Sequence, residues 1–477
     1  MNQLRNREFS ANHASPPAQP ILGWRAERNT PNIGFHTGAH RPADDQLHPI
    51  TDAGEGHLMT IAPTGAGKGR SVIIPTLLSY DGPVIVIDPK GENYDVTARR
   101  RREMGQSVFL LDPFGICKDQ AHCFNPLELI DPTRPDAFDQ ARAMVELLMP
   151  GHAFLTDPFW ETSAQTLIAA VALHVVAARP PVLKNIHEVV YLFNQSMEDF
   201  GFTIKEMIKS DCEVVRQTAN GYSGTEPKVM ASILSTARAG LAPFASDSFS
   251  QMSMNTGLPI QGIIDGDDIS IYLVLPPERL DTHGRFLRLW IGCLMDQICK
   301  RRHRVSRPTL FILDEAAQLG ALSQLRRAIT LLRGYGLRTW SFWQDLSQLQ
   351  RLYPDWQTLY NNTRYIQTFG ATTHLLAESL AHLLRLPSDI DPLTLPCHQM
   401  ILAEAHKQPR VVGKPDYLKD PHFRGLYDAN PFYQPAKSDT CERKIQQRPA
   451  PRTVAGDDNE STTIALEQLL KGDIDFK

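Results

Sequence analysis

A glycine-rich stretch has the residue types that bind phosphate: Ala62-Pro63-Thr64-Gly65-Ala66-Gly67-Lys68-Gly69. Small residues let successive backbone N–H groups turn onto an anion, the lysine reaches the β- and γ-phosphates, and the next helix points its N-terminus at the charge. Two positions depart from the usual pattern, since Ala62 replaces a glycine and Gly69 the magnesium-binding serine or threonine. A glycine-rich turn with an incidental lysine is the alternative. The predicted nucleotide-binding residues are Thr64, Gly65, Ala66, Gly67, Lys68, Gly69 and Arg70.

An apolar run, Leu310-Phe311-Ile312-Leu313, ends in the acidic pair Asp314-Glu315. If the run is a strand of an open α/β sheet, both carboxylates lie at the edge where ligands of such sheets bind. Asp314 would then hold Mg²⁺ through water, and Glu315 would orient and deprotonate the attacking water. A solvated acidic turn is the alternative. The glycine-rich stretch upstream favours a shared ATP and Mg²⁺ site.

A glutamine and two arginines are further candidates. Gln344 ends another apolar run, which starts at Thr339 and predicts a strand. There Gln344 can contact the γ-phosphate or the lytic water, or simply cap the strand. Arg333 and Arg338 flank a turn, Gly334-Tyr335-Gly336. An arginine presented to a neighbouring subunit's nucleotide would stabilise transition-state charge. Ordinary surface cations are the alternative for both.

Continuous apolar runs alternate with helical segments around these residues. Runs at His57–Pro63, Val84–Asp88 and Val108–Asp112 predict strands covered on both faces, and helices are predicted between them. This alternation predicts a doubly wound α/β fold with a parallel sheet. Asp88 or Lys90, after the second run, is expected near the nucleotide or a subunit border. Their spacing does not choose between these roles.

Helical periodicity dominates the middle of the chain, so we predict an all-α domain inserted into the nucleotide-binding domain. The predicted divisions are a partly ordered arm (1–45), the first part of the nucleotide-binding domain (46–136), the all-α insertion (137–255), the second part of the nucleotide-binding domain (256–415), and a largely disordered C-terminal extension (416–477).

The composition is that of an ordinary globular protein, with 42% hydrophobic residues and a formal net charge of −4 over 477 residues. Any DNA contact must therefore come from local patches or a pore built by several subunits. Two basic runs, Arg99–Arg102 and Lys300–Arg304, are candidates, and solvated helix faces are the alternative.

Seven cysteines without a CxxC pair favour a reducing compartment. The longest apolar run, Thr166–Ala178, is too short for a bilayer and predicts a buried helix.

With these motifs the chain resembles the type IV coupling proteins of conjugation and type IV secretion. The matching stretches are APTGAGKG (62–69), VIVIDPKGENYDVTA (84–98), CFNPLELI (123–130), FWETSAQTLI (159–168), LFILDEAAQLG (310–320) and RGYGLRTWSFWQDLSQLQ (333–350). The resemblance implies a hexameric RecA-like P-loop NTPase core that moves DNA, with an inserted all-α domain. The GKG ending of the glycine-rich stretch is common in this family.

The resemblance also implies roles by position. Lys68 looks like the phosphate-binding lysine, Asp314 serves magnesium, and Glu315 activates water. Arg333 resembles the family's trans-acting arginine, and Gln344 its nucleotide-sensing glutamine. The all-α domain would contact a relaxase or secreted substrate protein.

We therefore expect a DNA-stimulated ATPase that pumps DNA, independently of its sequence, through a homo-hexameric ring, with type IV secretion components as partners. Typical members begin with two membrane-spanning helices, which this sequence lacks. A cytoplasmic protein, peripheral at the inner membrane through a partner and monomeric in isolation, is expected. The alternatives are a cytoplasmic DNA-processing or defence pump, and a substrate-recruiting adaptor with weak hydrolysis.

Overall fold

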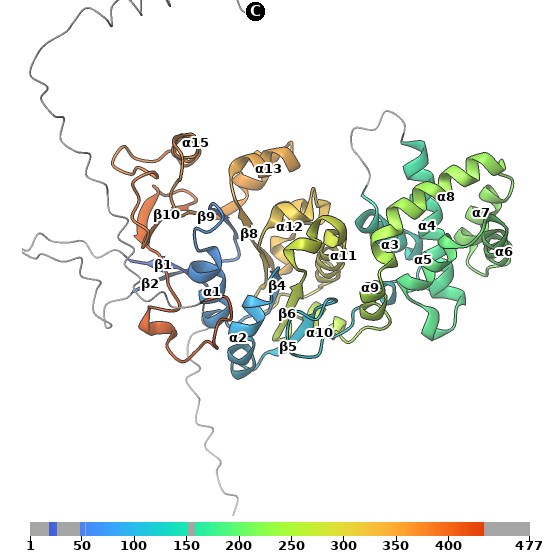
Figure 1. Cartoon of the computed structure of the whole chain (residues 1–477), viewed down its shortest axis with the longest axis horizontal. Helices are drawn as coiled ribbons and strands as arrows, with labels where there is room; N and C mark the ends of the chain where they lie inside the picture. Colours follow the sequence, from blue (N-terminus) through green and yellow to red (C-terminus); the bar gives the residue numbers. More distant parts are fainter. Residues whose placement is uncertain (1–18, 26–47, 53, 151–157, 434–477) are drawn as a thin grey trace, which may run out of the picture. The chain divides into compact units, whose positions relative to one another are not determined.

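This computed structural model describes residues 19–25, 48–52, 54–150 and 158–433. They contain one mixed β-sheet (Figure 1). Its eleven strands have the order β2-β1-β11-β10-β9-β3-β8-β7-β4-β6-β5. The strands from β9 to β5 in this order are parallel, and β10, β11, β1 and β2 are added antiparallel. The strands are β1 Ile21–Trp24, β2 Pro49–Thr51, β3 His57–Ile61, β4 Val84–Asp88, β5 Ser107–Leu111, β6 Ile269–Val274, β7 Thr309–Leu313, β8 Leu337–Trp343, β9 Thr363–Thr368, β10 Gln399–Glu404 and β11 Arg410–Gly413.

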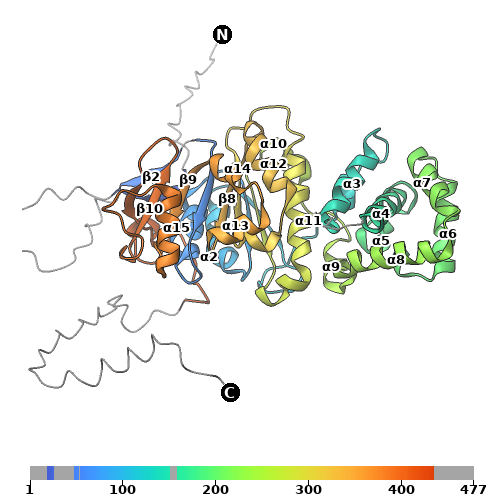
Figure 2. The same ribbon diagram turned by 90° about the horizontal axis from the view of Figure 1, so that it is seen from above.

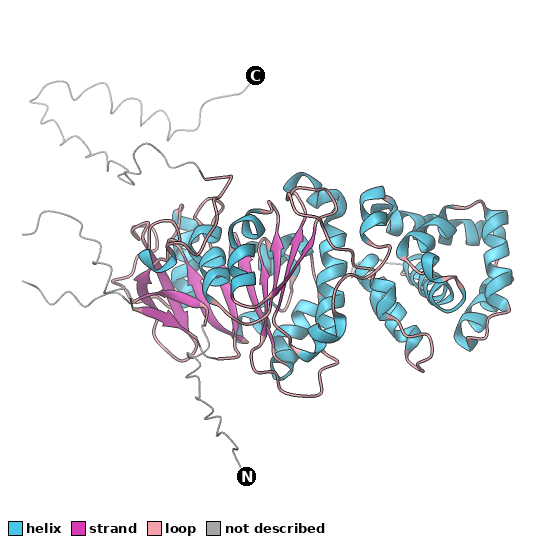
Figure 3. Ribbon diagram, turned by 90° about the horizontal axis from the view of Figure 1, so that it is seen from below, coloured by secondary structure: helices cyan, strands magenta, loops and turns pink. Residues whose placement is uncertain are grey.

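The parallel strands are buried on both faces because successive side chains point to opposite sides of a strand. In β4, Ile85 and Ile87 join one apolar core, while Val84 and Val86 join the other. Helices α1 and α2 contribute to the core on the second face, and α11 and α12 to the core on the first. Figure 3 shows the strands of the sheet with helices packed beside them. The parallel sheet predicted from the apolar runs is confirmed.

The helices of this α/β part lie between its strands along the chain. They are α1 Ile74–Ser79, α2 Glu92–Glu103, α10 Ile260–Asp265, α11 Leu280–Ile298, α12 Ser323–Leu331, α13 Leu346–Leu352, α14 Trp356–Asn361 and α15 His374–Leu384. Short 3-10 turns, among them Leu332–Tyr335, link several of them.

Between β5 and β6 the described chain is helical and contributes no strand to the sheet, so the helical insertion of the predicted fold class is confirmed (Figure 2). Its helices are α3 Ala137–Leu148, α4 Phe159–Ala178, α5 Ile186–Asn194, α6 Met197–Ile208, α7 Glu213–Ser223, α8 Pro227–Leu241 and α9 Asp247–Met252. Among the described helices, α4 is the one long and apolar enough to cross a membrane, but most of its apolar stretch is buried. The domain boundaries stay a prediction.

The two ends of the described chain carry more structure than their composition suggested. Within the predicted arm, β1 is buried in the sheet. At the start of the predicted C-terminal extension, residues 416–433 form turns with a 3-10 helix, Pro421–Phe423, and bury Tyr417 and Phe423. Residues 434–477 lie outside the described residues.

Buried arginines fix the loops at the N-terminal edge of the sheet. Arg301 makes five hydrogen bonds, to the carbonyl oxygens of residues 263, 264, 335 and 336 and to the Thr309 hydroxyl. Arg101 likewise donates to the carbonyls of Tyr80 and Gly82. Each lies inside one of the two runs considered for DNA contact, so neither guanidinium is available to DNA.

His57, at the start of β3, is a buried titratable group beside these loops. Its Nδ1 accepts a hydrogen bond from the Thr339 backbone N–H at 3.1 Å, which requires an unprotonated nitrogen. Burial, aided by the positive charges of Arg338 and Arg333, lowers the pKa of His57 to about 3.

We expect Arg301→Leu to reduce the free energy of unfolding by about 3 kcal/mol or more, because each buried carbonyl left without a donor costs about 1–3 kcal/mol. Urea unfolding measures the loss. Arg304→Leu is the matched control, because Arg304 is 85% exposed and holds a single ion pair with Glu55. Equal losses in the two variants would refute the structural role of Arg301.

We expect the free energy of unfolding to decrease as the pH is lowered, because His57 is buried in its neutral form. The unfolded chain takes up a proton below about pH 6.5, whereas the folded chain does so only near pH 3. The contribution is therefore complete above pH 6.5 and is lost toward pH 3, by at most about 1.4 kcal/mol per pH unit. His57→Asn, which keeps an acceptor, should flatten this slope in urea unfolding, and the exposed-site control His303→Asn should not. Identical slopes in wild type and His57→Asn would contradict the assignment.

Candidate nucleotide-binding site

The glycine-rich stretch forms an open loop between β3 and the helix that follows. Gly65 has φ +79° and Gly67 has φ +91°, in the left-handed region that favours glycine. A β carbon at Gly65 would meet no atom within 4 Å, so backbone conformation, rather than lack of room, requires this glycine. The chain then enters a π-helical turn, Gly69–Ile73, before α1. The backbone therefore has the open, inward-turning form that suits a phosphate chain.

Lys68 lies at the end of this loop and reaches across the sheet edge. Its buried side chain places Nζ 3.3 Å from the Ala62 carbonyl oxygen and 3.5 Å from Glu315 Oε1. Strands β3 and β7 are separated only by β8, a span of about 10 Å at normal strand spacing. A lysine side chain closes that gap, so residues far apart in the sequence meet in one site.

The acidic pair follows β7. Burial, with a smaller contribution from the neighbouring Glu315 charge, raises the pKa of Asp314 to about 6, against the opposing charge of Lys68. Glu315 has φ +54°, a left-handed conformation that is rare outside glycine and clusters at functional sites. At this turn the Glu315 carboxylate contacts both Lys68 and Gln344.

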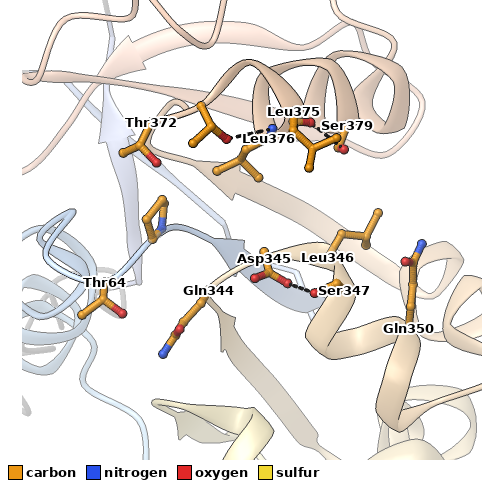
Figure 4. Close-up of a pocket in the computed structure, with 12 residues that line it drawn as sticks. Thr64, Gln344, Asp345, Leu346, Ser347, Gln350, Thr372, Leu375, Leu376 and Ser379 are labelled. Carbon is orange, nitrogen blue, oxygen red and sulfur yellow. Dashed lines mark hydrogen bonds between the residues drawn. The ribbon is translucent and has the colours of Figure 1, made fainter. Parts of the chain in front are cut away.

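Gln344 follows β8, which lies between the other two strands. Its Nε2 donates a hydrogen bond to Glu315 Oε2 at 2.9 Å, and its backbone N–H is held by Gln348 Oε1 at 3.0 Å. Gln344 and Thr64 line one side of a cavity of about 450 Å³ whose other wall includes Thr372 (Figure 4). The glutamine therefore connects the candidate base to the space beside the phosphate loop.

The three arginines considered from the sequence, Arg70, Arg333 and Arg338, differ in their positions and partners. Arg70 starts the helix after the loop, but its guanidinium forms a two-point ion pair with Asp416, at 2.8 Å for both bonds. Arg333 is exposed in the turn before β8, so the seven-residue strand separates it from Gln344 by about 20 Å. Arg333 therefore does not reach its own chain's site. Arg338 is buried and binds the Gly56 carbonyl and Asp52, so both interpretations of it, as a subunit-bridging arginine and as a surface cation, were wrong.

The sequence did not choose between two roles for Asp88, and it offered none for Lys414. Asp88 ends β4 and is buried, with its carboxylate accepting from the Tyr94 N–H at 2.8 Å, and burial raises its pKa to about 7. It therefore fixes the start of α2. Lys414 donates to the carbonyl oxygen of Ala66 in the phosphate loop at 3.2 Å. Its position late in the chain and its unremarkable surroundings gave no sequence signal.

The donor set fits a magnesium–nucleotide complex. Mg²⁺ takes oxygen ligands and keeps several waters, and the Asp314 carboxylate offers such an oxygen beside the loop. Gly69 has no hydroxyl, so a serine or threonine ligand is missing at that position. Lys68 offers a buried cation for the phosphates, and a β carbon added at Gly65 or Gly69 would meet no atom within 4 Å.

Comparison with known proteins places these features in a family. The family described as Type IV secretory system Conjugative DNA transfer matches residues 23–384. Protein VirD4 of Agrobacterium fabrum is 27% identical over 333 residues, which cover 68% of this chain and 48% of that protein. Conjugal transfer protein TraG of Escherichia coli is 23% identical over 339 residues, covering 66% and 52%. The chain thus spans about half the length of these curated relatives.

Solved structures share the fold. The bacterial conjugative coupling protein TrwBdeltaN70, in a trigonal form with sulphate, has a TM-score of 0.60 at 16% identity over 84% of this chain and 96% of that one. The plasmid coupling protein TrwB in complex with the ATP analogue ADPNP has a TM-score of 0.61 at 15% identity, covering 85% and 96%. The RecA-like core expected from the motifs is the fold of these coupling proteins. Since the family match extends over most of its sequence, the chain belongs to the type IV secretory system conjugative DNA transfer family.

Proposed function

We propose that this protein is an ATP-driven DNA translocase that acts as a coupling protein in conjugative type IV secretion. The observation that supports this most directly is the meeting of Lys68, Glu315 and Gln344 at one sheet edge. A structural turn would not need a buried lysine, a strained glutamate and a glutamine in contact. Membership of a family described by conjugative DNA transfer supports DNA, alone or as a nucleoprotein, as the proposed substrate class.

In this proposal each side chain acts on one part of the reaction. Lys68 neutralises the β- and γ-phosphates. Glu315 takes the proton of the attacking water, and its hydrogen bond from Gln344 holds the carboxylate oriented toward the loop. Gln344 senses the γ-phosphate, since loss of that group changes what its amide can bind. Mg²⁺, held through Asp314, supplies charge neutralisation between the phosphates when bound.

The position of Arg333 bears on assembly. It lies at the opposite end of β8 from the site, so it can act only on the nucleotide of another copy. Head-to-tail contacts form a ring when the rotation between copies closes, and we infer such a ring here, a homo-hexamer when active, built from chains that are monomeric in isolation. An open pore of this kind binds DNA phosphates without reading sequence.

Further partners follow from the family. Residues 137–255 would recruit a relaxase or another secreted protein, and other type IV secretion components would receive the substrate. The protein would work on the cytoplasmic side, at the inner membrane through a partner.

We expect Lys68→Ala and Glu315→Gln each to reduce DNA-stimulated ATPase activity by about 100-fold or more, because one loses phosphate binding and the other the general base. Phosphate release is measured with Mg²⁺ and with single-stranded, double-stranded or no DNA. Glu315→Gln should still bind a fluorescent ATP analogue, whereas Lys68→Ala should bind it weakly. Glu103→Gln, at an exposed glutamate of α2, is the control. Absence of ATPase activity in the wild type under every condition would favour an adaptor over a motor.

A mixing experiment tests Arg333 separately. Arg333→Ala and Glu315→Gln should each be inactive alone, because every site in a ring of one variant lacks one group. Mixed rings contain sites with an intact Glu315 from one copy and an intact Arg333 from the next, so about a quarter of wild-type activity should return. Full activity of Arg333→Ala alone, or no recovery on mixing, would refute the trans role.

A further inference from the structure

We propose that the segment from Lys414 to Phe432, here called the C-terminal strap, belongs to the nucleotide-binding machinery, with Lys414 as a positioning residue for the phosphate loop. This inference rests on the proposed ATP binding and deepens it, since neither the loop motif nor the acidic pair involves this part of the chain. The strap follows β11, the antiparallel strand that lies outside the parallel core.

The first contact is with the loop itself. Lys414 Nζ donates to the Ala66 carbonyl oxygen at 3.2 Å and lies 4.9 Å from the centre of the Phe369 ring. In a trans peptide the C=O and the next N–H point in opposite directions. Holding the Ala66 carbonyl on the Lys414 side therefore turns the Gly67 N–H to the other side, into the loop, where a phosphate oxygen would accept from it.

This orientation needs an external hold because the loop has little of its own. Gly65 and Gly67 flank Ala66, and glycine has the widest choice of backbone conformations, so the peptide between them can rotate readily. Within the loop, the Ala66 N–H donates to the Pro63 carbonyl at 3.2 Å. The Lys414 ammonium fixes the other end of the same residue, and it adds a second positive charge beside the loop after Lys68.

The second contact is two residues further along the strap. Asp416 binds both Nε and Nη2 of Arg70 at 2.8 Å, and the Tyr417 N–H lies 3.5 Å from the Arg70 carbonyl oxygen. Arg70 is the second residue of the helical turn that follows Lys68. The strap thus holds both the apex of the phosphate loop and the start of its helix.

The strap is itself firmly seated, so it can act as a hold. Tyr417 and Phe423 are buried in an apolar cluster with Ile74 and Leu78 of α1. Asp420 accepts a hydrogen bond from the Trp24 indole N–H at 2.9 Å, which ties the strap to β1.

The far end of the strap reaches the turn after β4. Asn430 donates to Glu92 Oε1 at 2.7 Å, and Lys90 lies 5.7 Å from the Phe432 ring. Strand β4, which precedes this turn, pairs with β7, the strand that ends at the acidic pair. The strap therefore extends from the phosphate loop to the opposite side of the candidate site.

The test compares nucleotide affinity with turnover in the full chain. We expect Lys414→Gln to weaken binding of a fluorescent ATP analogue with Mg²⁺ about tenfold, the scale of one charged hydrogen bond, with kcat within about twofold of wild type. The bond from Lys414 to the Ala66 carbonyl holds the loop that would bind the phosphates, so KM should rise while kcat stays. Lys414→Arg keeps a donor and should recover most of the affinity.

Asp416→Asn is a second, independent variant, in case Lys414→Gln does not fold. It removes the charge that binds Arg70 but keeps an oxygen for the Leu418 N–H, and it should weaken binding in the same direction. Asp136→Asn is the control, because it breaks a comparable two-point ion pair, with Arg134, outside both the strap and the phosphate loop, and its affinity should equal wild type. Unchanged affinity in folded Lys414 and Asp416 variants would overturn the inference alone, whereas a wild type that binds no ATP would overturn the proposed function.

Discussion

The contact between Lys68 and Glu315 is the constraint on which the candidate site depends. The two residues lie 3.5 Å apart but are supplied by strands that have β8 between them. Only parallel strands ending in step bring loop, acid and glutamine to one edge, and the pairings of Ile61 with Trp343 and of Leu313 with Ser341 keep them in step. A shift in register along β8 would move Gln344 out of reach of Glu315. The buried apolar faces of the sheet, by fixing this register, determine the chemistry.

How far the sequence predicted the fold depended on burial. Val84–Asp88 and Thr309–Leu313 are continuous apolar runs because helices cover both faces of their strands, and such runs are recognised without a structure. Strands β9, β10, β11, β1 and β2 were missed. The last four form the antiparallel part of the sheet and β9 borders it, and half-polar sequences such as that of Gln399–Glu404 have a weaker pattern. Their pairing depends on partners far away in the chain, which local periodicity does not report.

The same reasoning explains the site. Lys68, Glu315 and Gln344 follow apolar runs, so their places at the strand ends could be predicted, although their roles remain proposals. Buried and exposed arginines could not be distinguished from the sequence, because an arginine that binds backbone carbonyls inside the protein and one that faces solvent are the same residue type. Arg301, interpreted as a DNA contact or part of a solvated helix face, and Arg338, interpreted as a trans-acting arginine or a surface cation, are both buried.

The loops at the two edges of the sheet are held in different ways. At the N-terminal edge, buried arginines saturate loop carbonyls and leave little freedom, which suits an edge that must hold the register. At the C-terminal edge, the loop between β3 and α1 is built from flexible glycines and is held from outside by Lys414 and Asp416. A loop held in this way can be released by moving its holder, whereas a loop fixed by its own packing cannot. The strap contacts α1, α2 and the turn after β4. A displacement of these elements during turnover would therefore move the strap and change how it holds the phosphate loop.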